Sequence, residues 1–288
     1  MNAQAESRDA STLETGNDAS DDQARAQRVA VRRRRRMFML NVATRATSVT
    51  IVLILWEWLG GHVDPALFTK PSLIAVAAVD MIGSGELWSF LAPSLVVLAI
   101  GLSLASVIGI ATGLLLARFR IADVALGVYI TFLYSIPSVA LVPLIVLWAG
   151  YETTAKIVIL FMFAFFPMAI NTYQGVKNVD SKLLEVGRAF RCSERQLWAN
   201  IVLPGALPFI VTGLRLAVGR GLIGMVLADL YTAISGIGYL IVRTASTFQV
   251  DKMFVPIVTL GLLGVTLTAL LRILENRVAP WTLAGDQD

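Results

Sequence analysis

The chain contains 288 residues, of which 56% are hydrophobic and only 15% are charged, with a formal net charge of +4 and a mean hydropathy of +0.72. A soluble domain carries about a quarter charged residues, so this composition excludes an ordinary soluble protein. The single cysteine, Cys192, excludes an intrachain disulfide. Together with the single histidine, His62, it also excludes the common zinc sites and a thiol–imidazole catalytic pair.

The N-terminal region is the most highly charged part of the chain. Residues 1–36 carry 14 of the 44 charged side chains and end in five consecutive arginines. Residues 1–30 show no periodic apolar pattern, so we expect residues 1–36 to form a disordered basic tail in the cytoplasm. In an apolar chain such a basic run typically fixes membrane topology, and we therefore expect no nucleic-acid partner.

Long apolar segments follow this tail. Four runs contain no charged residue: 90–117, 124–151, 157–176 and 253–271. About 20 apolar residues cross the hydrocarbon core of a membrane as a helix. Two further segments are also apolar but less uniformly so. Together with the four runs, they predict an all-α, polytopic protein with six transmembrane helices embedded in lipid. The expected spans are 46–59, 90–117, 124–150, 154–176, 210–230 and 253–273, in a membrane domain of residues 37–280 followed by a cytoplasmic tail, 281–288.

Basic residues lie mostly on one side of the predicted spans. With the N-terminus inside, the inner segments hold residues 32–36, Arg118, Arg120, Lys177, Lys182, Arg188, Arg191, Arg195, Arg272 and Arg277. The outer segments hold Lys70, Lys156, Arg243 and Lys252. The positive-inside rule therefore places both termini and the polar connection 177–204 in the cytoplasm. No small-residue cleavage pattern follows the first span, which favours a signal anchor over a cleaved signal peptide.

The polar connection 177–204 has the local signals of a folded unit. Asp180 or Ser181 can cap a first short helix. Ser193 and Gln196 have the spacing of a capping box, which would start a second helix that Pro204 ends. Six apolar side chains would give this unit a face for a partner or for the underside of the membrane domain: Leu183, Leu184, Val186, Phe190, Leu197 and Trp198.

This connection resembles the EAA signature of importer-type ABC permeases, which is Glu-Ala-Ala, three residues, Gly, nine residues, Ile, one residue and Leu-Pro. The residues at the signature positions are Glu185, Val186, Gly187, Arg191, Ile201, Leu203 and Pro204. Val186 and Gly187 replace the two alanines, and Arg191 replaces the glycine. Glycine permits a left-handed turn, so we expect the turn at Arg191 to close differently. An ordinary basic loop is the alternative interpretation.

Further segments extend the resemblance over about residues 70–280. Three segments resemble, in the same order along the chain, the taurine, aliphatic sulfonate and nitrate importer permeases. They are residues 135–144 with 148–150, residues 165–167 with 171–173 and 175–176, and residues 236–241. The resemblance implies a permease subunit in the bacterial inner membrane that carries a small solute, such as a sulfonate, taurine or nitrate. It also implies three partners: an ABC ATPase docked on residues 177–204, an extracytoplasmic solute-binding protein, and a second permease copy.

The chain has no Gly-Lys dipeptide and hence no Walker A loop. We therefore expect no enzyme activity and no cofactor on this chain, with ATP and magnesium bound by the partner ATPase. A self-sufficient secondary transporter is the alternative, although Asp229 alone would have to supply ion coupling. A membrane-embedded enzyme and a non-transporting scaffold fit the residues less well.

Several polar or helix-breaking residues inside the spans are candidates for a translocation path. They are Ser135, Pro137, Ser138, Pro143, Asn171, Thr172 and Asp229. Breaks in a helix are tolerated at membrane depth where they face protein or a water-lined cavity. A packed helix kink is the alternative for the prolines, helix–helix contact for Asn171 and Thr172, and an interfacial position for Asp229. Gly101, Gly109 and Gly113 are predicted to be close-packing positions.

Overall fold

A computed structural model describes residues 37, 39–64 and 67–278, except for the side chains of residues 274, 276 and 278. The predicted tails, 1–36 and 281–288, lie outside the described residues. The chain divides into two parts, residues 1–62 and 63–288. In the first part the helix Met39–Gly60, with a mean hydropathy of 1.5, is long and apolar enough to cross a membrane.

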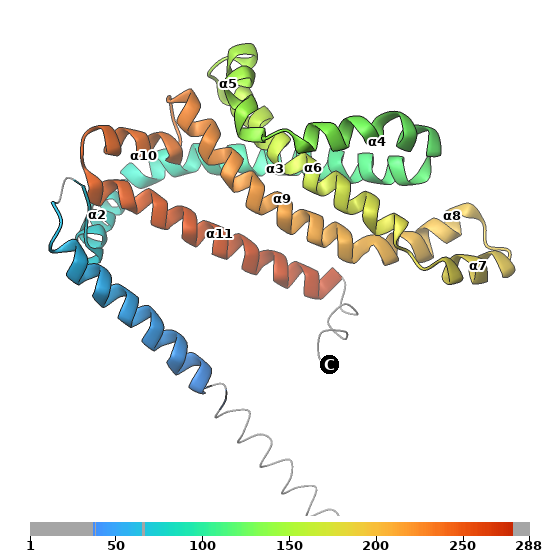
Figure 1. Cartoon of the computed structure of the whole chain (residues 1–288), viewed down its shortest axis with the longest axis horizontal. Helices are drawn as coiled ribbons and strands as arrows, with labels where there is room; N and C mark the ends of the chain where they lie inside the picture. Colours follow the sequence, from blue (N-terminus) through green and yellow to red (C-terminus); the bar gives the residue numbers. More distant parts are fainter. Residues whose placement is uncertain (1–36, 38, 65–66, 279–288) are drawn as a thin grey trace, which may run out of the picture. The chain divides into compact units, whose positions relative to one another are not determined.

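The described residues of the second part form a series of helices joined by connections (Figure 1). In chain order these are α2 (Pro71–Gly83), α3 (Glu86–Arg118), α4 (Arg120–Ser135), α5 (Ser138–Ala149), α6 (Thr153–Lys177), α7 (Ser181–Ala189), α8 (Glu194–Leu197), the π-helical turn η1 (Trp198–Val202), α9 (Leu203–Thr232), α10 (Ile237–Ser246) and α11 (Val250–Val278). Five helical runs of the described chain qualify as spans, or up to six if the bent pair α4 and α5 counts as one. The prediction of an all-α, polytopic membrane protein is confirmed.

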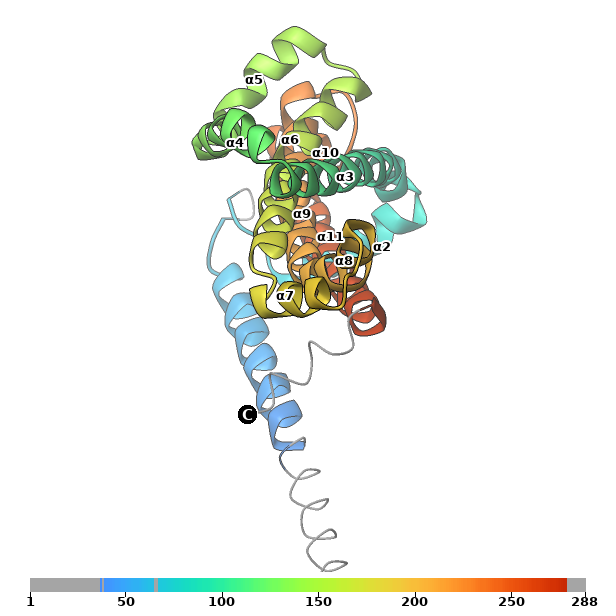
Figure 2. The ribbon, with the colours of Figure 1, turned by 90° about the vertical axis from the view of Figure 1, so that its right-hand side faces the viewer.

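Helix α6 lies between α3 and α9 at the centre of the second part, as Figures 1 and 2 show. Glycines on both neighbours allow close approach. A Cβ atom on Gly109 of α3 would lie 2.8 Å from the Met168 Cβ, and one on Gly213 of α9 would lie 2.9 Å from the Asn171 Cβ. Gly101 and Gly113 face α6 at similarly short distances, so the prediction that α3 uses glycines for close packing is confirmed.

The predicted third span is not one continuous helix. Helices α4 and α5 meet at an angle of 99°. The break lies at Ile136, whose backbone is extended (φ −71°, ψ 131°), because the residue before a proline disfavours helical geometry. Pro137 therefore interrupts the span as predicted. Pro143 lies inside α5, where it removes one backbone hydrogen bond without ending the helix.

The expectation that Pro204 ends a helix is also wrong. Residues Glu194–Thr232 form one helical run of 39 residues, in which Pro204 lies in the first turn of α9. The run continues because the turn before the proline is π-helical: the Leu203 N–H donates to the Trp198 carbonyl, five residues back. This wider turn relieves the clash that a proline ring makes with the carbonyl four residues before it.

Candidate functional site

Residues 181–197, which comprise α7, the following turn and α8, form a compact unit that we call the helical knob. Helix α7 begins at Asp180, whose Oδ1 accepts a 2.9 Å hydrogen bond from the Lys182 N–H. Helix α8 begins with the predicted capping box: the Ser193 hydroxyl accepts from the Gln196 N–H, and the Gln196 side chain accepts from the Ser193 N–H at 2.8 Å. Both helix starts are therefore fixed by local sequence.

The turn between the two helices closes at Arg191. This residue adopts the left-handed conformation with φ 57°. The Arg191 N–H donates to the Arg188 carbonyl at 2.9 Å, and the Cys192 N–H donates to the Gly187 carbonyl at 3.0 Å. These two bonds are those of a Schellman motif, which normally has glycine at this position. The expectation that the turn closes differently is therefore wrong, because the arginine accepts a strained backbone at a cost of about 1 kcal/mol.

Gly187 lies where α7 packs against the helical run that begins at Glu194. It is buried, and a Cβ atom there would come within 2.5 Å of the Leu197 Cδ2 and 3.0 Å of the Ile201 Cδ1. The signature positions Gly187 and Ile201 are therefore in contact across the turn. Of the other signature residues, Glu185 and Val186 are exposed on α7, whereas Leu203 and Pro204 belong to the start of α9.

One face of α7 is apolar and exposed. Leu183, Val186 and Phe190 are 54%, 52% and 81% exposed, and their spacing of three and four residues places them on one side of the helix. The other predicted members of this face point elsewhere: Leu197 is buried, and Leu184 and Trp198 are half-buried. The knob thus presents three large apolar side chains outward.

Arg118, at the end of α3, joins the membrane helices to the helical knob. Its guanidinium forms a 3.2 Å ion pair with Glu194 and lies 5.5 Å from the centre of the Trp198 ring. In the sequence, Arg118 indicates only the membrane topology. No local motif indicates this contact, because its partners lie more than 70 residues away along the chain.

The opposite end of α9 carries a buried ion pair. The Asp229 carboxylate has no exposed surface, and its Oδ1 accepts a 2.8 Å hydrogen bond from the Lys156 ammonium of α6. Its Oδ2 accepts a 2.6 Å hydrogen bond from the Ser94 hydroxyl of α3. The Lys156 ammonium also donates to the Ser235 carbonyl at 2.5 Å. Asp229 therefore joins three helices to the connection that precedes α10.

The glycine-rich stretch before α10 fits around this carboxylate. Gly236 has φ 102°, and a Cβ atom there would lie 2.2 Å from the Asp229 carboxylate. The Ile237 N–H donates to the Ser94 hydroxyl at 2.8 Å, and the Gly238 N–H donates to Asp229 Oδ2 at 3.4 Å. In the sequence, Lys156 falls in a predicted outer connection and Asp229 has no evident partner, so this network was not predicted.

Residues 105–280 match the family described as "binding-protein-dependent transport system inner membrane component". That match spans more than half of the chain. The chain belongs to this family.

Curated relatives agree with the family assignment of this permease. SsuC of Escherichia coli K12, whose name describes an aliphatic sulfonates transport permease, is 33% identical over 249 residues, or 86% of this chain and 94% of SsuC. The formylaminopyrimidine transport permease ThiX of Halalkalibacterium halodurans is 32% identical over 80% of this chain and 92% of its own length. The taurine transport system permease TauC of Escherichia coli K12 is 28% identical over 85% of this chain and 90% of its own length.

Solved structures support the fold. A chain of the inward-facing MetNI methionine ABC transporter is similar with a TM-score of 0.50 and 20% identity, covering 67% of this permease and 94% of that chain. The permease is thus an integral inner-membrane protein and a transport subunit that is not itself catalytic. ATP hydrolysis belongs to a separate subunit, and the family implies ATPase and binding-protein partners.

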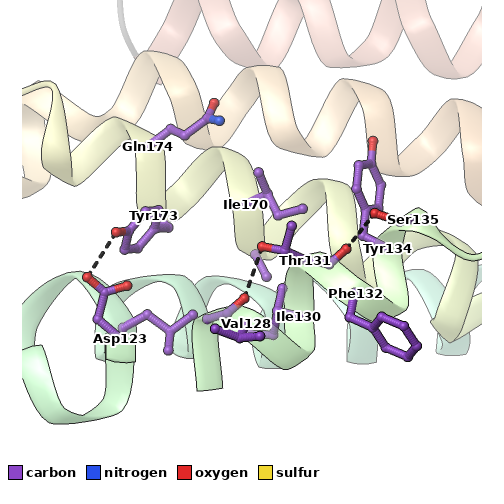
Figure 3. A pocket seen from close by; sticks show the side chains of 13 residues that line it. Asp123, Val128, Ile130, Thr131, Phe132, Tyr134, Ser135, Ile170, Tyr173 and Gln174 are labelled. Atoms are coloured by element: carbon purple, nitrogen blue, oxygen red, sulfur yellow. Dashed lines mark hydrogen bonds between the residues drawn. The ribbon is translucent and has the colours of Figure 1, made fainter. Parts of the chain in front are cut away.

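A cavity of about 780 Å³ lies between α4 and α6 of the permease (Figure 3). At one end the Asp123 carboxylate accepts a 3.0 Å hydrogen bond from the Tyr173 hydroxyl and lies 3.5 Å from the Lys177 ammonium. Tyr134 and Ser135 lie at the other end of the row of labelled side chains. The walls between them are mostly apolar, so the cavity offers polar groups chiefly at its two ends.

Ser135 is the one predicted path residue among those that line this cavity. Asn171 and Thr172 pack between helices: Asn171 donates to the Pro167 carbonyl at 2.8 Å and faces Gly213, and Thr172 is buried against Gly113. Pro137 and Ser138 lie at the bend between α4 and α5, and Pro143 is exposed on α5. Path lining by these residues and by Asp229 stays a prediction.

The Arg191 turn generates a prediction about local stability. We expect Arg191→Gly to slow amide exchange at Cys192 about fivefold, because removing the Cβ relieves about 1 kcal/mol of left-handed strain. Hydrogen–deuterium exchange of peptides covering residues 187–197 measures this effect. Arg195→Gly, in the right-handed α8, is the matched control and should accelerate exchange. Faster exchange in Arg191→Gly would contradict the strain assigned to this turn.

The buried ion pair predicts strong coupling between two substitutions. Lys156→Met or Asp229→Asn alone should each destabilise the permease by about 3 kcal/mol, because one buried group loses its partner. The double variant should recover most of that loss, because no unpaired charge remains. Thermal unfolding in detergent, read by size-exclusion chromatography after heating, compares the four proteins. Additive losses in the double variant would show that the two groups do not act as a pair.

Proposed function

We propose that this permease forms the translocation path of an ABC importer for a small solute and is coupled to ATP hydrolysis through the helical knob. The observation that carries this proposal is the exposed apolar face of α7 in a chain of this family. Leu183, Val186 and Phe190 are too large and too exposed to serve the fold of the knob itself. Such a patch, with a prominent aromatic residue, is typical of a protein interface.

The ATPase would therefore dock on residues 177–204 and bind ATP and magnesium itself. It would contact Glu185 on α7 and Phe190 at the C-terminal cap of that helix. The helical run Glu194–Thr232 supports coupling over a distance. It begins inside the knob and ends beside Asp229, which is bonded to α3 and α6. A displacement of the knob by the ATPase would move a single helical element that reaches the other end of the bundle.

The assembly that we propose contains two copies of this chain in the lipid of the inner membrane, each with cytoplasmic termini. The distribution of lysine and arginine supports that orientation. A binding protein would deliver the solute to the outer face. The names of SsuC and TauC support a small sulfonate or another anion as the solute, whereas the name of ThiX describes a formylaminopyrimidine.

Phe190 is the residue that tests ATPase docking most sharply. We expect Phe190→Asp to weaken association with the partner ATPase at least tenfold, because an exposed aromatic residue is replaced by a charge at the centre of the contact. Co-purification in detergent at graded ATPase concentrations measures the affinity. The matched control is Phe248→Asp, since Phe248 is 68% exposed in the connection between α10 and α11 and outside the knob.

Unchanged association of Phe190→Asp would contradict docking on this face of α7. Glu185→Arg extends the test to the signature carboxylate, and we expect it to weaken association as well. If the wild-type chain associates with no ATPase and still transports its solute, the importer proposal fails and the secondary transporter becomes the better account.

A further inference from the structure

Helix α9 has one exposed stripe along its length. The exposed residues recur at spacings of three and four: Thr212, Arg215, Leu216, Gly219, Arg220 and Ile223. The buried residues of α9, such as Ala217 and Gly221, alternate with them and face the rest of the bundle. A face in contact with lipid would be uniformly apolar, but this stripe contains two arginines and a threonine.

Arg220 lies well within the length of α9 rather than near either of its ends. A Cβ atom on the next residue, Gly221, would lie 3.7 Å from Leu160 and 3.9 Å from Leu102. Those two leucines lie well inside α6 and α3. Arg220 is also 12 residues before the end of α9, or about 18 Å along the axis. The guanidinium is therefore too far from that helix end to reach it by extending its side chain.

The two arginines of the stripe differ in their partners. Arg215 forms an ion pair with Glu275 of α11. Within the described part of the chain, no ion pair includes Arg220. Its guanidinium instead lies over the ring of Tyr134 of α4, 4.9 Å from the ring centre. Stacking on an aromatic face leaves the N–H donors at the edge of the guanidinium plane available to a ligand.

Open helix surface lies beside Arg220, and the tyrosine that it stacks on lines a cavity. A Cβ atom on Gly219 would meet no heavy atom within 4 Å, so the helix surface beside Arg220 is open. Tyr134, over which the guanidinium lies, and Ser135 both line the cavity between α4 and α6 (Figure 3). The carboxylate of that cavity, Asp123, lies at the other end of the row of labelled side chains and is bonded to Tyr173.

We propose that Arg220, held by Tyr134, forms an anion-binding site on the translocation path, where it binds the sulfonate or similar oxoanion group of the solute. A charged group at this depth is expensive in lipid and is expected to face a water-filled path. A planar guanidinium matches two oxygens of an oxoanion with two parallel hydrogen bonds. This inference rests on the proposed function and adds the residue that recognises the charge.

The test uses the complete transporter in proteoliposomes, with its ATPase and binding protein, and radiolabelled taurine and ethanesulfonate as probes. We expect Arg220→Gln to lower ATP-dependent uptake of both probes at least tenfold. Arg220→Lys should retain part of the uptake, because it keeps the charge and loses only the bidentate geometry. Arg215→Gln is the matched control on the same stripe and should transport like the wild type.

Co-elution of the ATPase and basal ATP hydrolysis are measured on the same preparations, and both should be unchanged in Arg220→Gln. Wild-type uptake that persists in Arg220→Gln would overturn the anion site and leave the importer proposal intact. Equal loss in Arg220→Gln and Arg220→Lys, or loss accompanied by dissociation of the ATPase, would show a structural role and overturn it. A wild-type transporter that takes up neither probe would overturn the sulfonate as solute and its recognition by Arg220.

Discussion

Close contact of α6 with α3 and α9 is the constraint on which the rest of the second part depends. Gly109 of α3 and Gly213 of α9 allow the backbones to approach from two sides, and the apolar side chains of α6 fill the space between them. Lipid provides little hydrophobic drive for helix association, so such contact and a few buried hydrogen bonds must supply it. The Asp229–Lys156 pair adds those bonds at one end of the same three helices.

In this packing, the long helical run of residues 194–232 connects the helical knob to the opposite end of the bundle. One end of the run is built into the helical knob, where Arg118 bonds Glu194 and Gly187 admits Leu197. The other end is held at Asp229. Between them, a π-helical turn precedes Pro204, and Pro208 lies inside the helix that follows. Under the proposed function, this run would carry a displacement of the knob through packed helices to the far side of the bundle.

Local signals in the sequence predicted much of this arrangement, but they did not predict the long-range contacts. Apolar length identified the spans, and the caps at Asp180 and Ser193 identified the helices of the knob. The residue before a proline avoids helical geometry, which predicted the break at Ile136. This rule does not give the angle between the two helices, so the 99° bend was not predicted. The same rule failed at Pro204, where a π-helical turn compensates for the proline. Lys156 and Asp229 are 73 residues apart, and no periodic pattern joins them.

The central claim is that the helical knob is the contact between this permease and an ATPase. The single cysteine of the chain, Cys192, lies in the knob and is partly exposed, so it can carry a photoactivated benzophenone without other substitutions. Irradiation of the assembled transporter, followed by mass spectrometry, identifies what the label touches. The account predicts an adduct with the ATPase subunit that is absent in Cys192→Ser. Adducts confined to lipid or to a second permease copy would contradict it.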